Sequence, residues 1–335
     1  MGRIRLALAV LAVIAAVAGL ASVLPANARA AFPGRNGRIL FLHEVPGPQP
    51  ICSDPLGPCE PLSYFEIRSA RPDGSHSRRL TSGHYDRSPS YSPDGRRIVF
   101  SRDGPGFKAE EIWLMRADGS HPRKLTDSGG VRPPRSTAPS FSPSGRRVAF
   151  ASAGGVVSVR TRDGKGRRVL FRSTNEIMFL SWSVRDVLAV AEDCRGIVGL
   201  WRASTRKIRS RRLVRGDCVD AFPGNFTWYP NWSPSGRRLA YMHRTWYHHP
   251  PTTYVDRIFL KRLSHRPRPY GHGDRDTAPV FSPNGRSLAF NRLTRFEGSP
   301  YDGDIRVARL GRGSRSTGLT GQLADWQPLP RRRHH

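Results

Sequence analysis

One short phrase recurs along this chain at nearly constant spacing. It reads aromatic-Ser-Pro, then Asp, Ser or Asn, then Gly-Arg and an aliphatic-rich stretch, as in YSPDGRRIVFSRD at 91–103. The aromatic residues that open it are Tyr91, Phe141, Trp182, Trp232 and Phe281, so the spacings are 50, 41, 50 and 49 residues. A fixed period of roughly 20–50 residues indicates a repeat architecture in which each repeat is one structural unit.

Each repeat contains enough strand-forming runs for a four-stranded sheet. In the repeat at 89–126, Pro93-Asp94-Gly95 is a turn sequence, because Pro presets φ and Asp and Gly tolerate turn conformations. Three strand-forming runs follow, at 97–100, 111–115 and 123–126. Together with the aromatic strand, they make four short antiparallel strands, which is typical of a β-propeller blade.

Two incomplete copies of the phrase close the ring. NGRILFLHE at 36–44 has only the second half of the phrase, and ADWQPLP at 324–330 has only the first half. Pairing the two removes the open sheet edges that invite aggregation. The sequence therefore predicts an all-β, six-bladed β-propeller of four-stranded blades, closed by a C-terminal strand at about 324–330 that completes blade 1. In blade 4, Val184 and Arg185 replace Pro and Ser and the turn glycine is lost, so we expect a distorted turn there.

The phrase, with its later aliphatic strand and Asp-Gly-Ser turn, resembles the repeat of TolB-like six-bladed propellers over about 36–330. The resemblance implies the fold and says little about function. TolB-type periplasmic proteins carry a further α/β domain before the propeller, and prolyl-oligopeptidase relatives add a hydrolase domain. This sequence leaves no room for the first and has no G-x-S-x-G nucleophile elbow for the second.

The first 30 residues predict an export signal. Arg3 and Arg5 precede an apolar run from Leu6 to Leu24, and small residues follow it. The run is long for a signal peptide, so an uncleaved anchor is the alternative. We expect a signal peptide at 1–30, the propeller at 31–330 and a basic tail at 331–335. The protein would then be secreted or held in the cell envelope, with no membrane span after cleavage.

The chain has four cysteines, Cys52, Cys59, Cys194 and Cys218. An even number in an exported chain favours disulfides. Because no pair has C-x-x-C spacing, a zinc site and a thioredoxin-like redox pair are disfavoured. Cys52 and Cys59 share one long loop. Cys194 and Cys218 fall in two loops that the expected strand order places on one face, so a bridge between them is feasible.

The formal net charge is +29, and arginine carries nearly all of the positive charge, because the chain has only five lysines. A basic surface attracts polyanions such as nucleic acid, anionic lipid or acidic cell-wall polymers. The alternative is a GC-rich genome that encodes arginine in place of lysine. Since the arginines are scattered along the sequence, both interpretations stay open.

Strand order predicts which face of the propeller binds a partner. Short, regular turns join the first strand to the second and the third to the fourth on one face, which we call the turn face. The other connections emerge on the opposite face, the loop face, and are long and dissimilar, as at 43–63, 216–229 and 243–254. Long loops on a rigid scaffold usually carry binding sites.

Aromatic and histidine side chains gather in two of these connections. The candidate binding residues are Phe226, Trp228, Tyr229, Trp246, Tyr247, His248 and His249. Such rings, beside arginine, can hold a sugar or an aromatic ligand; the alternative is that they pack between blades. Adjacent histidines rarely face one metal ion, and no carboxylate has suitable spacing to them, so the sequence indicates no metal site and no cofactor.

An acidic residue recurs near the start of the third strand in four blades: Glu66, Glu111, Asp256 and Asp304. Symmetry would gather these carboxylates near the mouth of the central channel, where they would bind a cation or a basic segment. The alternative is that each accepts a hydrogen bond from a neighbouring blade.

Two functions remain open. The first is a monomeric, exported, non-catalytic binding module or scaffold that holds a protein or an anionic envelope polymer on its loop face. The alternative is an enzyme, a lyase or hydrolase acting on acidic polysaccharide, with its site at the channel mouth. Acid–base catalysis needs paired titratable groups, and we find no catalytic motif. Export argues against a nucleic-acid partner.

Overall fold

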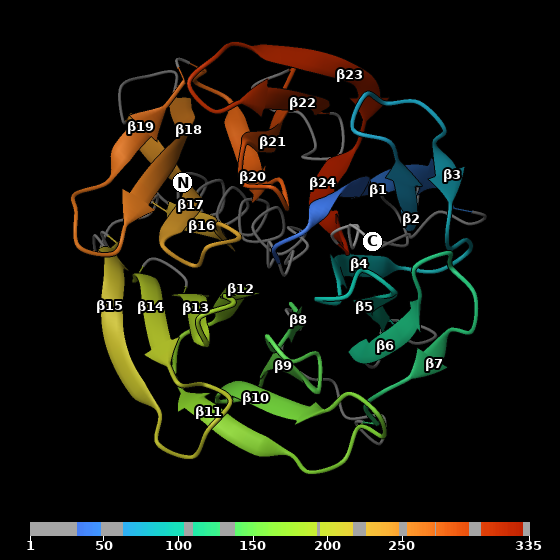
Figure 1. Cartoon of the computed structure of the whole chain (residues 1–335), viewed down its shortest axis with the longest axis vertical. Coiled ribbons are helices and arrows are strands. Elements are labelled where there is room, and N and C mark those ends of the chain that lie inside the picture. Colours follow the sequence, from blue (N-terminus) through green and yellow to red (C-terminus); the bar gives the residue numbers. More distant parts are fainter. Residues whose placement is uncertain are drawn as a thin grey trace, which may run out of the picture.

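Six four-stranded sheets form a ring in the computed structural model (Figure 1). The described residues are 32–47, 63–103, 110–127, 138–192, 195–216, 226–247, 253–271, 273–294 and 303–330. Within each sheet all neighbouring strands are antiparallel. The predicted all-β, six-bladed propeller is therefore confirmed.

The strands of each blade run from the axis to the rim. Blade 1 comprises β24 (Gln322–Leu329), β1 (Arg35–Pro46), β2 (Ser63–Ala70) and β3 (Arg78–Arg79). Blade 2 comprises β4 (Asp86–Tyr91), β5 (Arg97–Asp103), β6 (Glu110–Arg116) and β7 (Arg123–Lys124). Blade 3 comprises β8 (Ser140–Phe141), β9 (Arg147–Ser152), β10 (Gly155–Arg160) and β11 (Arg168–Arg172).

The second half of the ring follows the same order. Blade 4 comprises β12 (Ile177–Trp182), β13 (Val187–Glu192), β14 (Gly196–Trp201) and β15 (Arg209–Arg215). Blade 5 comprises β16 (Phe226–Trp232), β17 (Arg238–Tyr247), β18 (Thr253–Arg262) and β19 (Arg268–Tyr270). Blade 6 comprises β20 (Asp276–Phe281), β21 (Ser287–Arg292), β22 (Asp304–Arg309) and β23 (Ser314–Thr320).

The C-terminal strand closes the ring as predicted. β24 lies antiparallel to β1, with Ile39 opposite Trp326 and Leu42 opposite Gln322. Figure 1 shows the red β24 beside the blue β1. The Trp326 side chain is 1% exposed, and its indole N–H donates to the Gly37 carbonyl at 3.2 Å. The last strand of the sequence is thus the innermost strand of the first blade.

The Ser-Pro-Asp-Gly turn needs its glycine. Gly95 has φ +68°, a region that favours glycine, and a Cβ on it would collide with the Pro328 carbonyl. In blade 4 the turn is one residue shorter, because the Ser183 amide donates to Val187, four residues on. Asp186 takes the positive φ there, +59°, and accepts the Trp182 indole N–H at 3.0 Å. The distorted turn expected in blade 4 is therefore a tighter turn held by an aspartate.

Neighbouring blades are joined at the aromatic residue of the phrase. The side chain just before one aromatic accepts a hydrogen bond from the backbone N–H of the next blade's aromatic. Ser140 accepts from Trp182 at 3.1 Å, Ser181 from Trp232 at 3.3 Å, Asn231 from Phe281 at 2.8 Å and Asp325 from Tyr91 at 2.7 Å. These bonds give each of the buried backbone N–H groups an acceptor, as buried polar groups require.

The seam between blades 6 and 1 is different. Val280 occupies the acceptor position in blade 6 and has no polar atom on its side chain. The Trp326 amide bonds instead to Asp325 Oδ1 at 2.7 Å, while Asp325 Oδ2 serves Tyr91 and the Ser90 hydroxyl. One fully buried carboxylate therefore satisfies donors of blade 1 and of blade 2.

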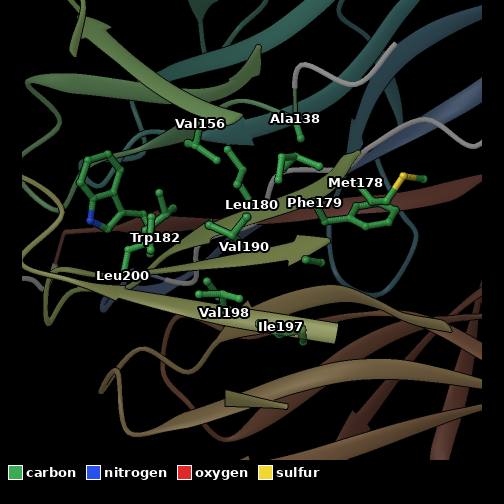
Figure 2. Close-up of a cluster of buried hydrophobic side chains, with 14 of the residues drawn as sticks. Ala138, Val156, Met178, Phe179, Leu180, Trp182, Val190, Ile197, Val198 and Leu200 are labelled. Atoms are coloured by element: carbon green, nitrogen blue, oxygen red, sulfur yellow. The ribbon is translucent and has the colours of Figure 1, made fainter. Parts of the chain in front are cut away.

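Apolar side chains fill the space between blades. Figure 2 shows Val156 of blade 3 facing Leu180 and Val190 of blade 4, within a cluster that continues into blade 5. Toward the axis, the rings of Phe179 and Tyr229 lie 4.3 Å apart. The Tyr229 hydroxyl accepts from the Gln322 side chain at 3.1 Å, although blade 6 separates their two blades. This hydrogen bond links blades 5 and 1 past the inner end of blade 6.

Removing the closing strand should destroy the fold. A chain ending at Gly321 loses β24, leaves the edge of β1 unpaired and discards the buried Trp326. Loss of a buried Trp side chain alone costs about 3–5 kcal/mol. We expect aggregation or loss of the cooperative melting transition, measured by gel filtration and circular dichroism. A chain ending at Pro330, which lacks only the five-residue tail, is the control and should melt like the full chain.

Replacing the shared carboxylate should weaken the ring more than replacing a neutral acceptor. Asp325→Ala orphans buried donors in two blades and should cost about 3 kcal/mol, whereas Ser181→Ala should cost about 1 kcal/mol. Asp325→Asn should fall between them, since Asn231 of blade 5 accepts from one donor, the Phe281 N–H of blade 6. Urea denaturation of the three variants tests this order, and equal midpoints for Asp325→Ala and Ser181→Ala would contradict it.

Candidate functional site

A long hairpin in blade 5 rises on the loop face. β17 and β18 have ten residues each, whereas β5, β6, β13 and β14 have six or seven. Within the described residues, the innermost strand β16 pairs with β17 as far as Phe226 opposite Arg244. β17 and β18 continue for three more pairs, ending at Tyr247 opposite Thr253. We call residues 244–247 and 253–256 the blade 5 hairpin.

Arg244 holds the base of this hairpin. Its guanidinium donates two hydrogen bonds of 2.7 Å to the fully buried Asp256. The guanidinium carbon lies 3.9 Å from the ring centre of Tyr254, 5.5 Å from Trp228 and 5.7 Å from Trp246. Burial lowers the pKa of Arg244, but the hydrogen bonds and charge of Asp256 outweigh it and raise that pKa. The charged side chain of Arg244 therefore holds three aromatic rings and the strands β17 and β18 together.

Blades 2 and 6 also carry an arginine near the end of the second strand, at one shared phrase position. Arg102 donates to both oxygens of Asp86 at 2.6 and 2.9 Å, and Arg292 donates to both oxygens of Asp276 at 2.8 and 2.9 Å. In each blade the aspartate lies on the innermost strand, directly opposite the arginine. These bidentate pairs fix the end of the second strand to the first at the loop face.

Blade 5 departs from this arrangement. Thr227 and His243 take the positions of the aspartate and the arginine, and Thr227 Oγ1 and His243 Nδ1 lie 3.1 Å apart. Arg244 is one residue further along β17, opposite Phe226, and it pairs with Asp256 on the third strand. This pair links the second and third strands at the point where the hairpin extends. Arginine closes the phrase as FSR and FNR in blades 2 and 6, but its pairing was not predicted from the sequence.

The structure separates the predicted aromatic residues into two groups. Trp228 and Tyr229 are buried, at 6% and 3% exposure, and Phe226 is half-buried and stacked on Trp228 with ring centres 4.8 Å apart. Trp246 is half-buried against Tyr254 at 5.0 Å. Tyr247 is 46% exposed. Of these residues, Tyr247 presents the most surface to a partner.

The four recurring carboxylates lie on the third strands of their blades: Glu66 on β2, Glu111 on β6, Asp256 on β18 and Asp304 on β22. Two strands separate each from the axis. Glu66 pairs with Arg68 and Arg79, Glu111 accepts from Thr126 and pairs with Lys124, and Asp304 pairs with Arg306 and accepts from Ser316. These partners, like Arg244 for Asp256, belong to the same blade, so the structure does not gather the four carboxylates at the channel.

Several predicted features lie outside the described residues. These are the signal at 1–30, the tail at 331–335, His248, His249 and all four cysteines, Cys52, Cys59, Cys194 and Cys218. Within the described ranges, no three His, Cys, Asp or Glu side chains gather as metal ligands would. A search of the same ranges for a helix long and apolar enough to cross a membrane finds none.

No protein-family model matches the chain. Among curated proteins, an uncharacterised protein of Agrobacterium fabrum is 40% identical over 65 residues, which is 19% of this chain and 22% of that protein. The match thus spans about a fifth of the relative's length.

Solved structures are similar over most of the chain. TolB from Acinetobacter baumannii has a TM-score of 0.62 at 16% identity, covering 87% of this chain and 67% of that one. A chain of a nidogen/laminin complex has a TM-score of 0.58 at 11% identity, covering 87% and 97%. The periplasmic gluconolactonase of Pseudomonas aeruginosa has a TM-score of 0.50 at 13% identity, covering 87% and 83%. At such identities the likeness concerns the fold, and the chain is a TolB-like six-bladed β-propeller.

Proposed function

We propose that this chain is an exported, non-catalytic binding module that holds a protein or envelope-polymer partner on its loop face. The observation that carries the proposal is the blade 5 hairpin, whose two strands pair as far as Tyr247 opposite Thr253 and which presents Tyr247 to solvent. Arg244 and Asp256 already fix the hairpin in the free protein. A preorganised surface loses less entropy on binding, and exposed aromatic residues are frequent binding hot spots.

The likeness in fold to other propellers supports a binding role, since one similar chain belongs to a nidogen/laminin complex and another is TolB. Among the described residues of the loop face, the paired strands of the blade 5 hairpin and the exposed Tyr247 form the surface that we assign to the partner.

The alternative is an enzyme acting on acidic polysaccharide. The likeness in fold to a periplasmic gluconolactonase is the observation that favours it. The described carboxylates nearest the axis on the loop face favour the binding role. Asp86 and Asp276 are each bound by an arginine through two hydrogen bonds, so both carboxylates already have structural partners.

The purified chain should leave acidic polysaccharides intact. Incubation with polyuronates and cell-wall polymers, followed by gel filtration of the polymer and a reducing-end assay, should show no shortening over the buffer control. Shortening that disappears in an Asp86→Asn or Asp276→Asn variant would contradict the non-catalytic proposal.

The hairpin variant separates binding from folding. Replacing residues 245–255 with Asn-Gly retains Arg244 and Asp256, and should abolish partner retention at high salt while leaving the melting temperature nearly unchanged. Tyr247→Ser should weaken retention roughly tenfold, the effect of losing one aromatic hot spot. Pull-down from the envelope fraction of the source cells measures this.

Val184→Ser is the matched control for Tyr247→Ser. Val184 is also an exposed large apolar residue, 38% exposed, but it lies in the turn between β12 and β13 on the turn face. It should retain the partner like the wild type. Equal losses in the two variants, or full retention by the shortened hairpin, would contradict a site on the blade 5 hairpin.

A further inference from the structure

A groove of about 650 Å³ lies between blades 3 and 4, at the outer part of the loop face. One wall is the end of β11 and the segment that follows it, from Phe171 to Asn175. The other wall comprises Arg195 and residues 210–212 of β15. Blade 5 hairpin residues are not among those that line the groove. The groove is therefore a second candidate site.

The groove carries a strong excess of positive charge. Arg172, Arg195, Arg211 and Arg212 line it, and all four are exposed. Within the described ranges, none of these arginines forms an ion pair with a carboxylate. Arg212 donates to the Arg195 carbonyl at 3.0 Å, which fixes one guanidinium in the wall.

The carboxylate in the groove does not neutralise these arginines. Glu192 is 4% exposed and accepts the Ser173 hydroxyl at 2.5 Å and the Asn175 amide at 3.4 Å. Its hydrogen bonds therefore go to neutral donors, which hold the segment after β11 in place.

We propose that this groove binds an acidic polysaccharide, with the carboxylates of its uronic acid residues facing Arg172, Arg195 and Arg211. The guanidinium is a planar fork that matches a carboxylate in two hydrogen bonds. Serine, threonine and asparagine side chains between the arginines offer donors and acceptors for sugar hydroxyls. The two walls come from different blades, so the site depends on the packing of blade 3 against blade 4.

The lining favours a glycan over single-stranded nucleic acid. Phe171 is the one aromatic residue among the described lining residues, and it is half-buried. One ring can pack under one sugar. Proteins that bind single strands without sequence preference usually stack successive bases on several aromatic rings.

A charge-matched pair of double variants tests the site. Arg172→Gln with Arg211→Gln removes one arginine from each wall, and no hydrogen bond of either side chain within the described chain is lost. Arg312→Gln with Arg315→Gln removes the same charge from the outer turn and strand of blade 6. The probe is a fluorescein-labelled alginate oligosaccharide, a linear polymer with one carboxylate per sugar, titrated by fluorescence anisotropy at low and moderate salt.

We expect the groove double variant to bind the alginate probe roughly tenfold more weakly, with a shallower salt dependence, because charge-assisted contacts and counterion release are both lost. The blade 6 double variant should stay within about twofold of the wild type. Labelled dextran, which is neutral, should not bind. Tyr247→Ser should bind alginate normally, so this result is distinguishable from failure of the hairpin proposal.

Equal weakening in the two double variants would mean that net charge alone binds the probe, and the groove site would be rejected. Wild-type affinity in the groove double variant would reject it as well. Tighter binding of an oligothymidylate, with the same dependence on the groove arginines, would replace the glycan by a single-stranded nucleic acid. If the double variant fails to fold, the single variants Arg172→Gln and Arg211→Gln answer the same question.

Discussion

The ring depends on the contacts between neighbouring blades. One carboxylate, Asp325, accepts hydrogen bonds from two blades at once. Each blade is a separate sheet, so stability between blades comes from side-chain packing and from hydrogen bonds at the innermost strands. Most of these bonds use a neutral acceptor for one donor. Asp325 serves donors in blades 1 and 2 because Val280 supplies no acceptor to Trp326. The strand that closes the ring therefore also carries its strongest acceptor.

The closed ring limits where function can lie. Near the axis, Tyr229 contacts Phe179 of blade 4 and accepts from Gln322 of blade 1, so these inner side chains hold blades together. Both proposed sites lie instead on the loop face, one at the blade 5 hairpin and one toward the rim between blades 3 and 4. Inner strands contact the neighbouring blades on both sides, which leaves their side chains less free to bind a partner.

Blade 5 shows how one blade acquires an individual feature. In blade 6, the arginine near the end of the second strand binds an aspartate on the innermost strand. In blade 5, His243 and Thr227 take the positions of that arginine and aspartate, and Arg244, one residue further along, pairs with Asp256 on the third strand. The buried carboxylate has a charged partner in either case, as a desolvated charge requires. The pair of Arg244 and Asp256 ties together the two strands that extend as a hairpin.

The sequence by itself determined the fold. The spaced aromatic-Ser-Pro phrase set the number of blades, the turn residues set their strands, and the half-phrases at 36–44 and 324–330 set the closure. The blades and turns depend on residues close together in one repeat. The closure could be predicted because each half-phrase lacks the part that the other supplies. The same reasoning identified the loop face, because strand order alone fixes which connections share a face.

Only the tertiary structure decided which side chains meet. Arg172 and Arg211 are scattered charges in the sequence and face one groove in the ring. Trp228 and Tyr247 looked equivalent as loop aromatics, but one is buried beneath Arg244 and the other is exposed. Glu66 and its counterparts recur at one position, yet each is bound within its own blade. Such contacts depend on how neighbouring sheets pack and on which partner neutralises each buried charge. A sequence pattern shows neither the packing nor the choice of partner, because both join residues from different strands.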